Sequence, residues 1–421
     1  MGIGVNMKIA NAAARLASAT AATDRTTETG AGMAASLTRG ATDILRSMSP
    51  WIRTPEELAH FVASLDGCRA LALDSESDSL HHHFEKVCLV QIASDRGDAR
   101  LVDPLALNTM DALANVLADP AVLKVFHGAD YDVTTMKRDF AFRFENLFDT
   151  MIAARFVGAT EFGLQALLRA ELGVELSKDS QKDDWSRRPL TPTQEAYALA
   201  DVQHLLELQA RLAARLQELG RLAWVQEECT AVAGLDAARR RNDPEAYQQI
   251  KGARALPPRA LAILREVHRW RESRAAATDV PAFKILSSET LLALAQKAPH
   301  SPADLASVRG VPQRIRADPK PLLEAIATGE AIPANELPSI PRPVRPRVPE
   351  VVSQRVEILK TWRRGAAKAF GLDVSIILPQ RLLDRVAERA PREPAALAEI
   401  DGIRRWRIEA LGQGIVDALV S

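Results

Sequence analysis

In the stretch LALDSESDSL, residues 71–80, an apolar run passes directly into acidic side chains. Residues 71–73 have the pattern of a buried strand, and Asp74 and Glu76 follow, two residues apart. Residues i and i+2 of a strand point to the same face, so these two carboxylates would crowd one spot, where like charges raise each other's pKa. A surface turn tolerates such crowding, whereas at a buried strand end a bound divalent metal ion is the usual explanation.

The strand that runs into these acids is one of several that alternate with helices between residues 51 and 150. This alternation indicates an α/β sheet with helices packed on it. After residue 150 the pattern turns helical, and Thr191, Pro192 and Gln194 form a capping box that predicts one long helix over residues 191–220. The predicted strands are 69–74, 87–94, 99–103, 122–127 and 144–148, and the predicted helices are 55–65, 109–118 and 131–141.

The composition favours a soluble globular protein. Its 421 residues suffice for two or three domains, and 47% of them are hydrophobic and 26% charged. No apolar run reaches the length of a membrane span, which predicts no membrane partner. Cys68, Cys88 and Cys229 have no CxxC spacing, so we expect reduced thiols in a cytoplasmic protein. Residues 1–48 are interpreted as a disordered extension or an over-long start, with a targeting peptide as the alternative.

The charges are unevenly spread along the chain. Residues 251–421 hold 28 Lys and Arg against 19 Asp and Glu, a net +9, which leaves −9 for residues 1–250. A basic back half suits a nucleic-acid partner, although ordinary solvated helix faces would also give this pattern.

The basic half contains an internal repeat at a separation of 92 residues. Such a self-repeat indicates two like modules, each a small helical bundle. We therefore predict a domain over residues 49–240, modules over 251–336 and 351–421, and a stiff Pro- and Arg-rich linker over 337–350. The matching pairs are Trp270 with Trp362, Leu286 with Leu378, Leu291 with Leu383, Ala295 with Ala387, Pro299 with Pro391, Leu305 with Leu397, and Gly310 with Gly402. We expect both tryptophans to lie in the bundle cores.

Two further stretches supply acids to a metal site. In KVFHGADYDVTTM (124–136), Asp130 and Asp132 follow a strand-like run, and the spacing alone does not choose between them. In the helix that Thr191 opens, Tyr197 and Asp201 lie four residues apart, hence on one face. Leu205 and Leu208 continue that face as an apolar stripe, which predicts that Asp201 points inward, where an unpaired charge is costly.

The order of these motifs resembles that of the DEDD superfamily of 3′→5′ exonucleases in its Tyr-containing branch. The segment QKDDWSRRPLTPTQEAYALADVQHL (181–205), with WxxRPL leading into YxxxD, is similar to the ribonuclease D family, and the repeated modules resemble its two HRDC domains. Phe148-Asp149-Thr150 and Gly163-Leu164-Gln165 stand where the family has short motifs. The resemblance implies a ribonuclease H-like α/β exonuclease domain, a mixed sheet flanked by helices, followed by two all-α HRDC-like bundles.

The resemblance also assigns roles to residues. Asp74, Glu76, Asp132 and Asp201 match the four metal-binding acids, with the family register favouring Asp132 over Asp130, and Tyr197 matches the catalytic tyrosine. Substrate contacts are expected from His127, Gln165, Lys182, Arg187 and Arg188. The tract His81-His82-His83 departs from the family pattern and is expected to be a polar loop near the mouth of the site.

The mechanism implied is two-metal phosphodiester hydrolysis with Mg²⁺ or Mn²⁺, in which Tyr197 orients the attacking water. The expected product is a nucleoside 5′-monophosphate released from RNA with a free 3′ end, with tRNA precursors as substrates and no obligate protein partner. Two alternatives remain open at this point. One is a DNA 3′→5′ exonuclease, and the other is a non-catalytic RNA-binding scaffold.

Overall fold

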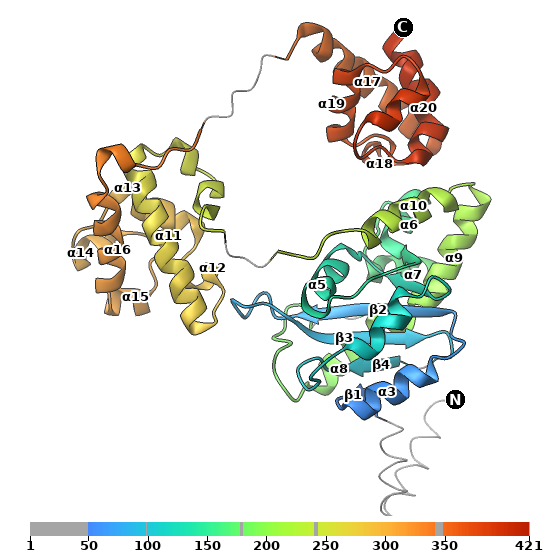
Figure 1. The fold of residues 1–421 in the computed structure, drawn as a ribbon, viewed down its shortest axis with the longest axis horizontal. Helices are drawn as coiled ribbons and strands as arrows, with labels where there is room; N and C mark the ends of the chain where they lie inside the picture. The colour runs from blue at the N-terminus through green and yellow to red at the C-terminus, as the bar shows by residue number, and fades with distance from the viewer. Residues whose placement is uncertain (1–48, 98, 177–179, 240–242, 342–347, 421) are drawn as a thin grey trace, which may run out of the picture. The chain divides into compact units, whose positions relative to one another are not determined.

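The computed structural model describes residues 49–421 apart from residues 98, 177–179, 240–242, 342–347 and 421. The extension predicted for residues 1–48 and the middle of the predicted linker lie outside the described residues. Within the described part, no helix is both long and apolar enough to cross a membrane. Figure 1 shows a sheet with flanking helices in the first half of this part, and two purely helical bundles in the second.

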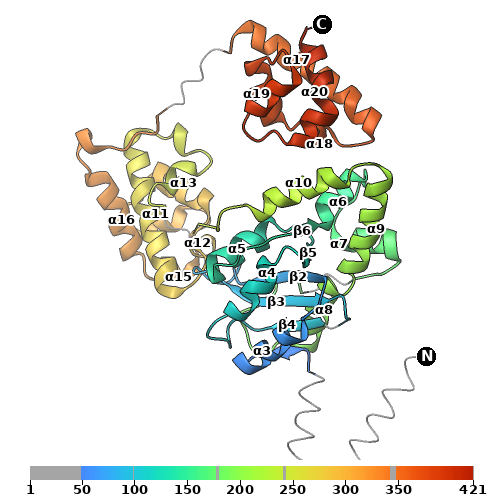
Figure 2. The same ribbon diagram turned by 45° about the vertical axis from the view of Figure 1, so that its right-hand side comes forward.

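Six strands form one mixed sheet in the order β1-β4-β3-β2-β5-β6. The interior strand β2 runs antiparallel to β3 and parallel to β5, while β4 is antiparallel to β3, and the outer pairs β1–β4 and β5–β6 are parallel. Figure 2 shows the strands in sequence from β6 at the top, through β5, β2 and β3, to β4. The strands are β1 (Trp51–Ile52), β2 (Ala70–Ser77), β3 (Val87–Ser94), β4 (Ala99–Val102), β5 (Leu123–Phe126) and β6 (Leu147–Asp149).

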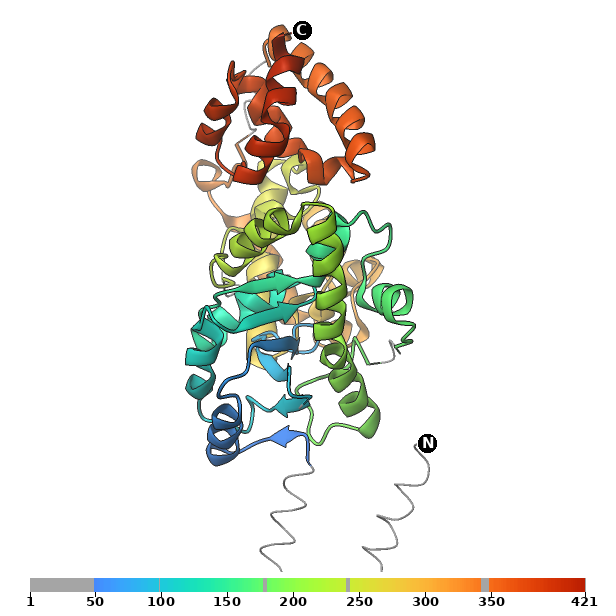
Figure 3. The ribbon, with the colours of Figure 1, turned by 90° about the vertical axis from the view of Figure 1, so that its right-hand side faces the viewer.

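Helices cover both faces of the sheet. One face contributes Val90, Ile92 and Val102 to the main hydrophobic core, and on the opposite face Leu89 and Leu101 pack with Ala198 of α8. Figure 3 views the sheet from its edge, with blue and teal helices on one side and the green α8 and α9 on the other. The helices of this domain are α3 (Pro55–Ser64), the 3₁₀ turn η1 (Asp111–Leu113), α4 (Ala114–Ala118), α5 (Asp130–Phe140), α6 (Thr150–Phe156), α7 (Leu164–Leu172), α8 (Pro192–Gln203), α9 (Leu205–Glu218) and α10 (Leu222–Ala233).

The structure corrects three expectations about these elements. The single helix predicted over residues 191–220 is wrong, because the chain leaves helical geometry at His204, with φ −110° and ψ 0°, and divides into α8 and α9. Leu205 and Leu208 therefore belong to α9 and not to the helix of Asp201. Strand β2 continues to Ser77, so its two acids lie inside the strand and not at its end. Strand β1 was not predicted.

The two bundles repeat their elements at the predicted separation of 92 residues. The long helices α11 and α17 both have 21 residues, and the next three helices of each bundle keep the same offset. Trp270 and Trp362 were expected in the bundle cores, but both lie half-buried at the edges of the hydrophobic clusters. The first bundle consists of η2 (Ala246–Gln249), η3 (Ala253–Ala255), α11 (Pro258–Thr278), α12 (Ala282–Ile285), α13 (Ser288–Lys297), α14 (Pro302–Ser307), α15 (Gln313–Ala317), α16 (Lys320–Ala331) and η4 (Ala334–Glu336). The second consists of α17 (Glu350–Phe370), α18 (Val374–Ile377), α19 (Gln380–Arg389), η5 (Pro394–Glu399) and α20 (Arg405–Val420).

Candidate active site

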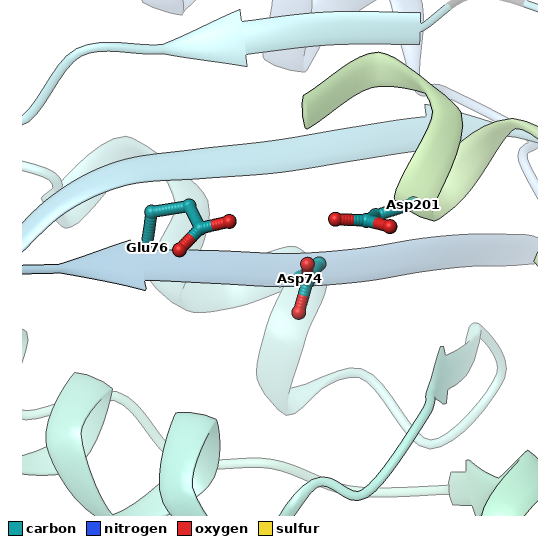
Figure 4. A group of neighbouring side chains, drawn as sticks. All are labelled: Asp74, Glu76 and Asp201. Atoms are coloured by element: carbon teal, nitrogen blue, oxygen red, sulfur yellow. The ribbon is translucent and has the colours of Figure 1, made fainter. Parts of the chain in front are cut away.

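Carboxylates from β2 and α8 meet on one face of the sheet. Asp74 and Glu76 alternate with Ser75 along β2, and Asp201 comes from the last turn of α8. One carboxylate oxygen from each acid lies within 4.8 Å of the others, and this is the one cluster of potential metal ligands found among the described residues. Figure 4 shows Glu76 and Asp201 with their carboxylates turned toward one another and Asp74 beside them. The structure therefore brings three of the four predicted metal ligands together.

The acids of this cluster hold their protons far more strongly than exposed carboxyls do. Burial raises the pKa of Glu76 to about 9 and that of Asp201 to about 7, and burial together with the charge of Asp132 raises the pKa of Asp74 well above its ordinary value. A divalent cation would offset this repulsion. Because every donor atom is a carboxylate oxygen, the set fits hard cations such as Mg²⁺ or Mn²⁺.

Asp132, the fourth predicted ligand, lies in the first turn of α5 and is 7% exposed, whereas its neighbour Asp130 is exposed. Its carboxylate accepts a hydrogen bond from the Ser75 hydroxyl, a contact that the sequence reasoning missed. Burial raises the pKa of Asp132 to about 6. Its charge in turn raises the pKa of Asp74 and Glu76, so it lies close to the cluster without belonging to the closest set of oxygens. A ligand role for Asp132 stays a prediction.

Tyr197 lies one turn before Asp201 on α8, and hydrogen bonding from its hydroxyl counteracts the rise in the pKa of Asp201. Burial and the neighbouring acids raise the pKa of Tyr197, so the phenol stays neutral at physiological pH. The start of α8 is held by the predicted capping box, in which Thr191 and Gln194 each bond to the other's backbone. This cap positions the helix that carries both of these predicted site residues.

A cavity of about 670 Å³ opens beside the acids, within the size range of small-molecule sites in proteins. Five of the predicted residues line it, and residues 160–166 and Arg169 form another part of its wall. The side chain of Gln165 donates a hydrogen bond to the Leu176 carbonyl. The predicted site residues that line the cavity are Asp74, His127, Gln165, Tyr197 and Asp201.

The hydrogen bonds around His127 determine which of its nitrogens is protonated. The hydroxyl of Thr150 donates its single proton to the Phe126 carbonyl at 3.0 Å, so it accepts from His127 Nδ1 at 2.9 Å. Burial lowers the pKa of His127, and the imidazole is therefore neutral. Its Nε2 is left as a buried acceptor without a protein partner.

The three predicted cations of the 181–190 segment differ in their surroundings. Lys182 is exposed, and Arg187 is largely exposed and paired with Asp184. The Arg188 guanidinium donates to both oxygens of the buried Asp103, at 2.7 and 2.8 Å, and to the Cys88 carbonyl at 2.7 Å. Protein groups thus occupy Arg188, which holds this segment against β3 and β4. Substrate contacts by these three residues stay predictions.

The predicted histidine loop lies against the same segment. His81 Nε2 is 3.1 Å from the Lys182 carbonyl, and His82 Nε2 is 2.9 Å from the Ser186 hydroxyl. These histidines are absent from the metal-ligand cluster found in the described residues. Asp183 was not predicted as a site residue, but its charge contributes to the raised pKa of Glu76 and its carboxylate accepts from Gln194 at 3.0 Å. Asp183 stands within the quoted QKDDW segment, but nothing in its spacing marks it.

Comparison with protein families gives two matches. Residues 50–217 match the 3′-5′ exonuclease family, and residues 260–326 and 353–419 match the HRDC domain. The two HRDC matches fall on the two bundles that repeat at 92 residues, which explains the repeat.

Curated relatives and solved structures agree with these matches. The chain is 34% identical over 377 residues to ribonuclease D of Pseudomonas paraeruginosa, which covers 88% of this chain and 97% of that protein. It is 32% identical to ribonuclease D of Granulibacter bethesdensis, over 87% and 92% of the two chains. The crystal structure of Escherichia coli RNase D shares the fold, with a TM-score of 0.65 and 24% identity over 88% of this chain and 98% of that one. The catalytic core of RRP6 from Trypanosoma brucei, at 28% identity, gives a TM-score of 0.59 over 66% and 79% of the two chains. The chain therefore belongs to the ribonuclease D family.

Proposed function

We propose that this protein, a 3′–5′ exoribonuclease by its family, removes nucleoside 5′-monophosphates from RNA by two-metal hydrolysis. The observation that carries the proposal is the convergence of Asp74, Glu76 and Asp201 within 4.8 Å beside a cavity of about 670 Å³. When bound, two Mg²⁺ or Mn²⁺ ions supply Lewis-acid stabilisation of the scissile phosphate and a lowered pKa for the attacking water. The residues that would hold them are these three acids and Asp132.

Tyr197 is proposed to orient the attacking water. Hydrogen bonding from its hydroxyl lowers the pKa of Asp201, and the phenol oxygen can at the same time accept a hydrogen bond from water. Because its pKa is raised, Tyr197 does not act as a base. The same hydrogen bond keeps the Asp201 carboxylate oriented on the face of α8 that meets β2.

His127 is proposed to contact the ribose of the terminal nucleotide. A bare imidazole nitrogen accepts hydrogen bonds and repels phosphate oxygens, which carry no proton at neutral pH. Ribose hydroxyls are the donors that a 3′-terminal nucleotide offers, and the 2′-hydroxyl is present in RNA alone. The orphaned Nε2 of His127 can therefore accept from the 3′-hydroxyl of RNA or DNA, and only a bond to the 2′-hydroxyl would favour RNA.

The two HRDC bundles are proposed to hold structured RNA, with tRNA precursors in the cytoplasm as the substrates. Their half of the chain carries a net charge of +9, which suits contacts between Lys or Arg and RNA phosphates. Such contacts fix the position of the RNA on the protein without reading its base sequence. The three cysteines of the described residues are free and buried, as expected for a reducing compartment.

The deciding assay incubates purified protein with a 3′-extended tRNA and with matched RNA and DNA oligomers, each with Mg²⁺ and with EDTA. We expect release of 5′-monophosphates from RNA that EDTA abolishes. Asp74→Asn should lower this rate by at least about a thousandfold, equivalent to about 4 kcal/mol of transition-state stabilisation, without unfolding the protein. Full activity of this variant would remove the proposed centre, and faster hydrolysis of DNA would favour the DNA alternative.

Melting the protein with and without millimolar Mg²⁺ distinguishes the non-catalytic scaffold from the metal-dependent enzyme. A ligand that binds only the native state raises stability, so the proposed site predicts a metal-dependent rise in melting temperature. If the protein binds RNA equally well in EDTA and its melting temperature does not rise with Mg²⁺, the scaffold alternative holds and the proposed enzymatic function fails.

A further inference from the structure

Gln91, in the middle of β3, is a polar side chain that the fold buries without using. It is 0% exposed, and neither its amide nitrogen nor its amide oxygen has a hydrogen-bond partner. Buried carboxamides are almost always paired, because an unpaired one loses its bonds to water and gains nothing in return. A role outside the apolar packing of the strand is therefore required to explain it.

The sheet register places Gln91 directly opposite Asp74. The two residues face each other across the antiparallel β2–β3 pair, so their side chains share one face with Cβ atoms about 4.5–5.5 Å apart. On its other side Gln91 faces Leu101 of β4, which packs with Ala198 of α8. Gln91 thus lies under α8, on the same face of the sheet as the acidic cluster.

The cross-strand neighbours of the two β2 acids differ in a way that matches this position. Opposite Glu76 stands Leu89, which has no polar atom, whereas opposite Asp74 stands a carboxamide with two donor hydrogens. From this cross-strand position the Gln91 amide can donate to the Asp74 carboxylate.

We propose that Gln91 is a positioning residue for the metal site, an inference that rests on the proposed function. Without metal the amide is unpaired, and when the ion is bound its Nε2 would donate to Asp74 and hold that carboxylate in one orientation. The terminal torsion of glutamine is broad, so the amide reaches this orientation without leaving its rotamer. A neutral donor suits the place, because a lysine would compete with the ion and a further acid would add repulsion.

The test compares Gln91→Met with the control Leu101→Met, which changes the neighbouring buried position on the same face. Melting temperature is measured against Mg²⁺ concentration for both variants and the original protein. We expect Gln91→Met to melt no lower than the original in EDTA, since it removes an unpaired polar group. The Mg²⁺ concentration needed to reach a given temperature shift should rise at least about tenfold, as for other partners of metal ligands. Leu101→Met should leave that concentration unchanged.

Activity supplies the second readout. At saturating Mg²⁺ the kcat of Gln91→Met should approach that of the original protein, with the loss confined to low metal concentrations. Gln91→Asn keeps the amide on a shorter stem and should shift the metal response by less. If Gln91→Met, or Gln91→Asn where the methionine variant does not fold, shows the same dependence of melting temperature on Mg²⁺ as the original protein, the assignment of Gln91 is overturned. If the original protein itself shows no metal-dependent shift, the metal site of the proposed function fails instead.

Discussion

Single residues of the acidic cluster bind protons in the folded protein that they would release in the unfolded chain. Glu76 and Asp201 have pKa values of about 9 and 7 because burial penalises their charged forms. Metal ions and protons therefore compete for the same oxygens, and the affinity for metal must rise with pH. This competition links the chemistry of the site to the stability of the fold.

The metal-free protein should become less stable as pH rises. Carboxyls whose folded pKa exceeds the unfolded one stabilise the fold at low pH and lose that contribution as pH rises toward the folded value. For Glu76 the window runs from its ordinary pKa of 4.5 to about 9. We expect the melting temperature in EDTA to fall from pH 5 to pH 9, and the increase caused by Mg²⁺ to be larger at pH 9 than at pH 6.

The matched pair for this experiment is Asp201→Asn and Glu218→Gln. Asp201→Asn removes one member of the cluster and should weaken the pH dependence, whereas Glu218 is an exposed acid at the end of α9 and should have no effect. A metal-free melting temperature that climbs between pH 5 and pH 9 would contradict the raised pKa values.

Tyr197→Phe should lower kcat by about a hundredfold, the lower end of what a group that positions a transferred proton contributes. Removal of the phenol also removes a hydrogen bond that lowers the pKa of Asp201. The acidic limb of the pH–rate profile should therefore move to higher pH, which a purely structural defect would not cause. Tyr247→Phe changes a buried tyrosine of the first bundle and is the control. An unchanged profile in Tyr197→Phe would separate this residue from the reaction.

At the scale of elements, the strongest local signals predicted the structure best. Strand β3 spans residues 87–94 as expected, and the capping box at Thr191 is present. Strand β1 has two residues, too few for a hydrophobic period, and is held by its pairing with β4. The break at His204 carries no Gly or Pro signal. The two helices pack on different strands, α8 on β2, β3 and β4 and α9 on β2 and β5.

The candidate site shows the same division. Asp74, Glu76, Tyr197 and Asp201 could be predicted because strand and helix periods place their side chains, and the motif order chose among the acids. Ser75, Asp183 and Gln91 could not, since their roles depend on which strand or loop lies opposite them. The cross-strand register that brings Gln91 to Asp74 is a property of the assembled sheet.

Thr191→Ala tests how far the cap of α8 supports the site. The Thr191 side chain accepts from the Gln194 backbone, and loss of such a cap costs about 1 kcal/mol. We expect a lower urea midpoint for the unfolding transition that responds to Mg²⁺. Thr328→Ala replaces an exposed threonine inside α16, where alanine is the better helix former, and should cost nothing. Equal effects of the two variants would show that the cap is dispensable.

At the scale of the whole molecule, the separation of charge between an acidic front half and a basic back half predicts two salt dependences. Each phosphate contact adds about 0.7–0.9 to the slope of log affinity against log salt. Two such contacts from the basic half would raise the KM for a 3′-extended tRNA about tenfold between 50 and 200 mM salt. The KM for a dinucleotide, which reaches the cavity alone, should change much less. Equal salt dependence for both substrates would contradict a role of the basic half in RNA binding.

The hydrogen-bond register between β2 and β3 runs without interruption from Leu71 to Glu76. Alpha carbons two positions apart on such a strand stand about 6.7 Å from each other, a distance that the backbone cannot lengthen. Mg²⁺ takes oxygen at about 2.0–2.1 Å, while Ca²⁺ requires about 2.3–2.6 Å and more ligands. Calcium should bind to the same acids and raise the melting temperature as magnesium does. Because the fixed strand spacing suits the shorter Mg²⁺–oxygen distance, bound Ca²⁺ should inhibit hydrolysis in competition with Mg²⁺. Turnover in Ca²⁺ equal to that in Mg²⁺ would mean that the strand accommodates ions of either size.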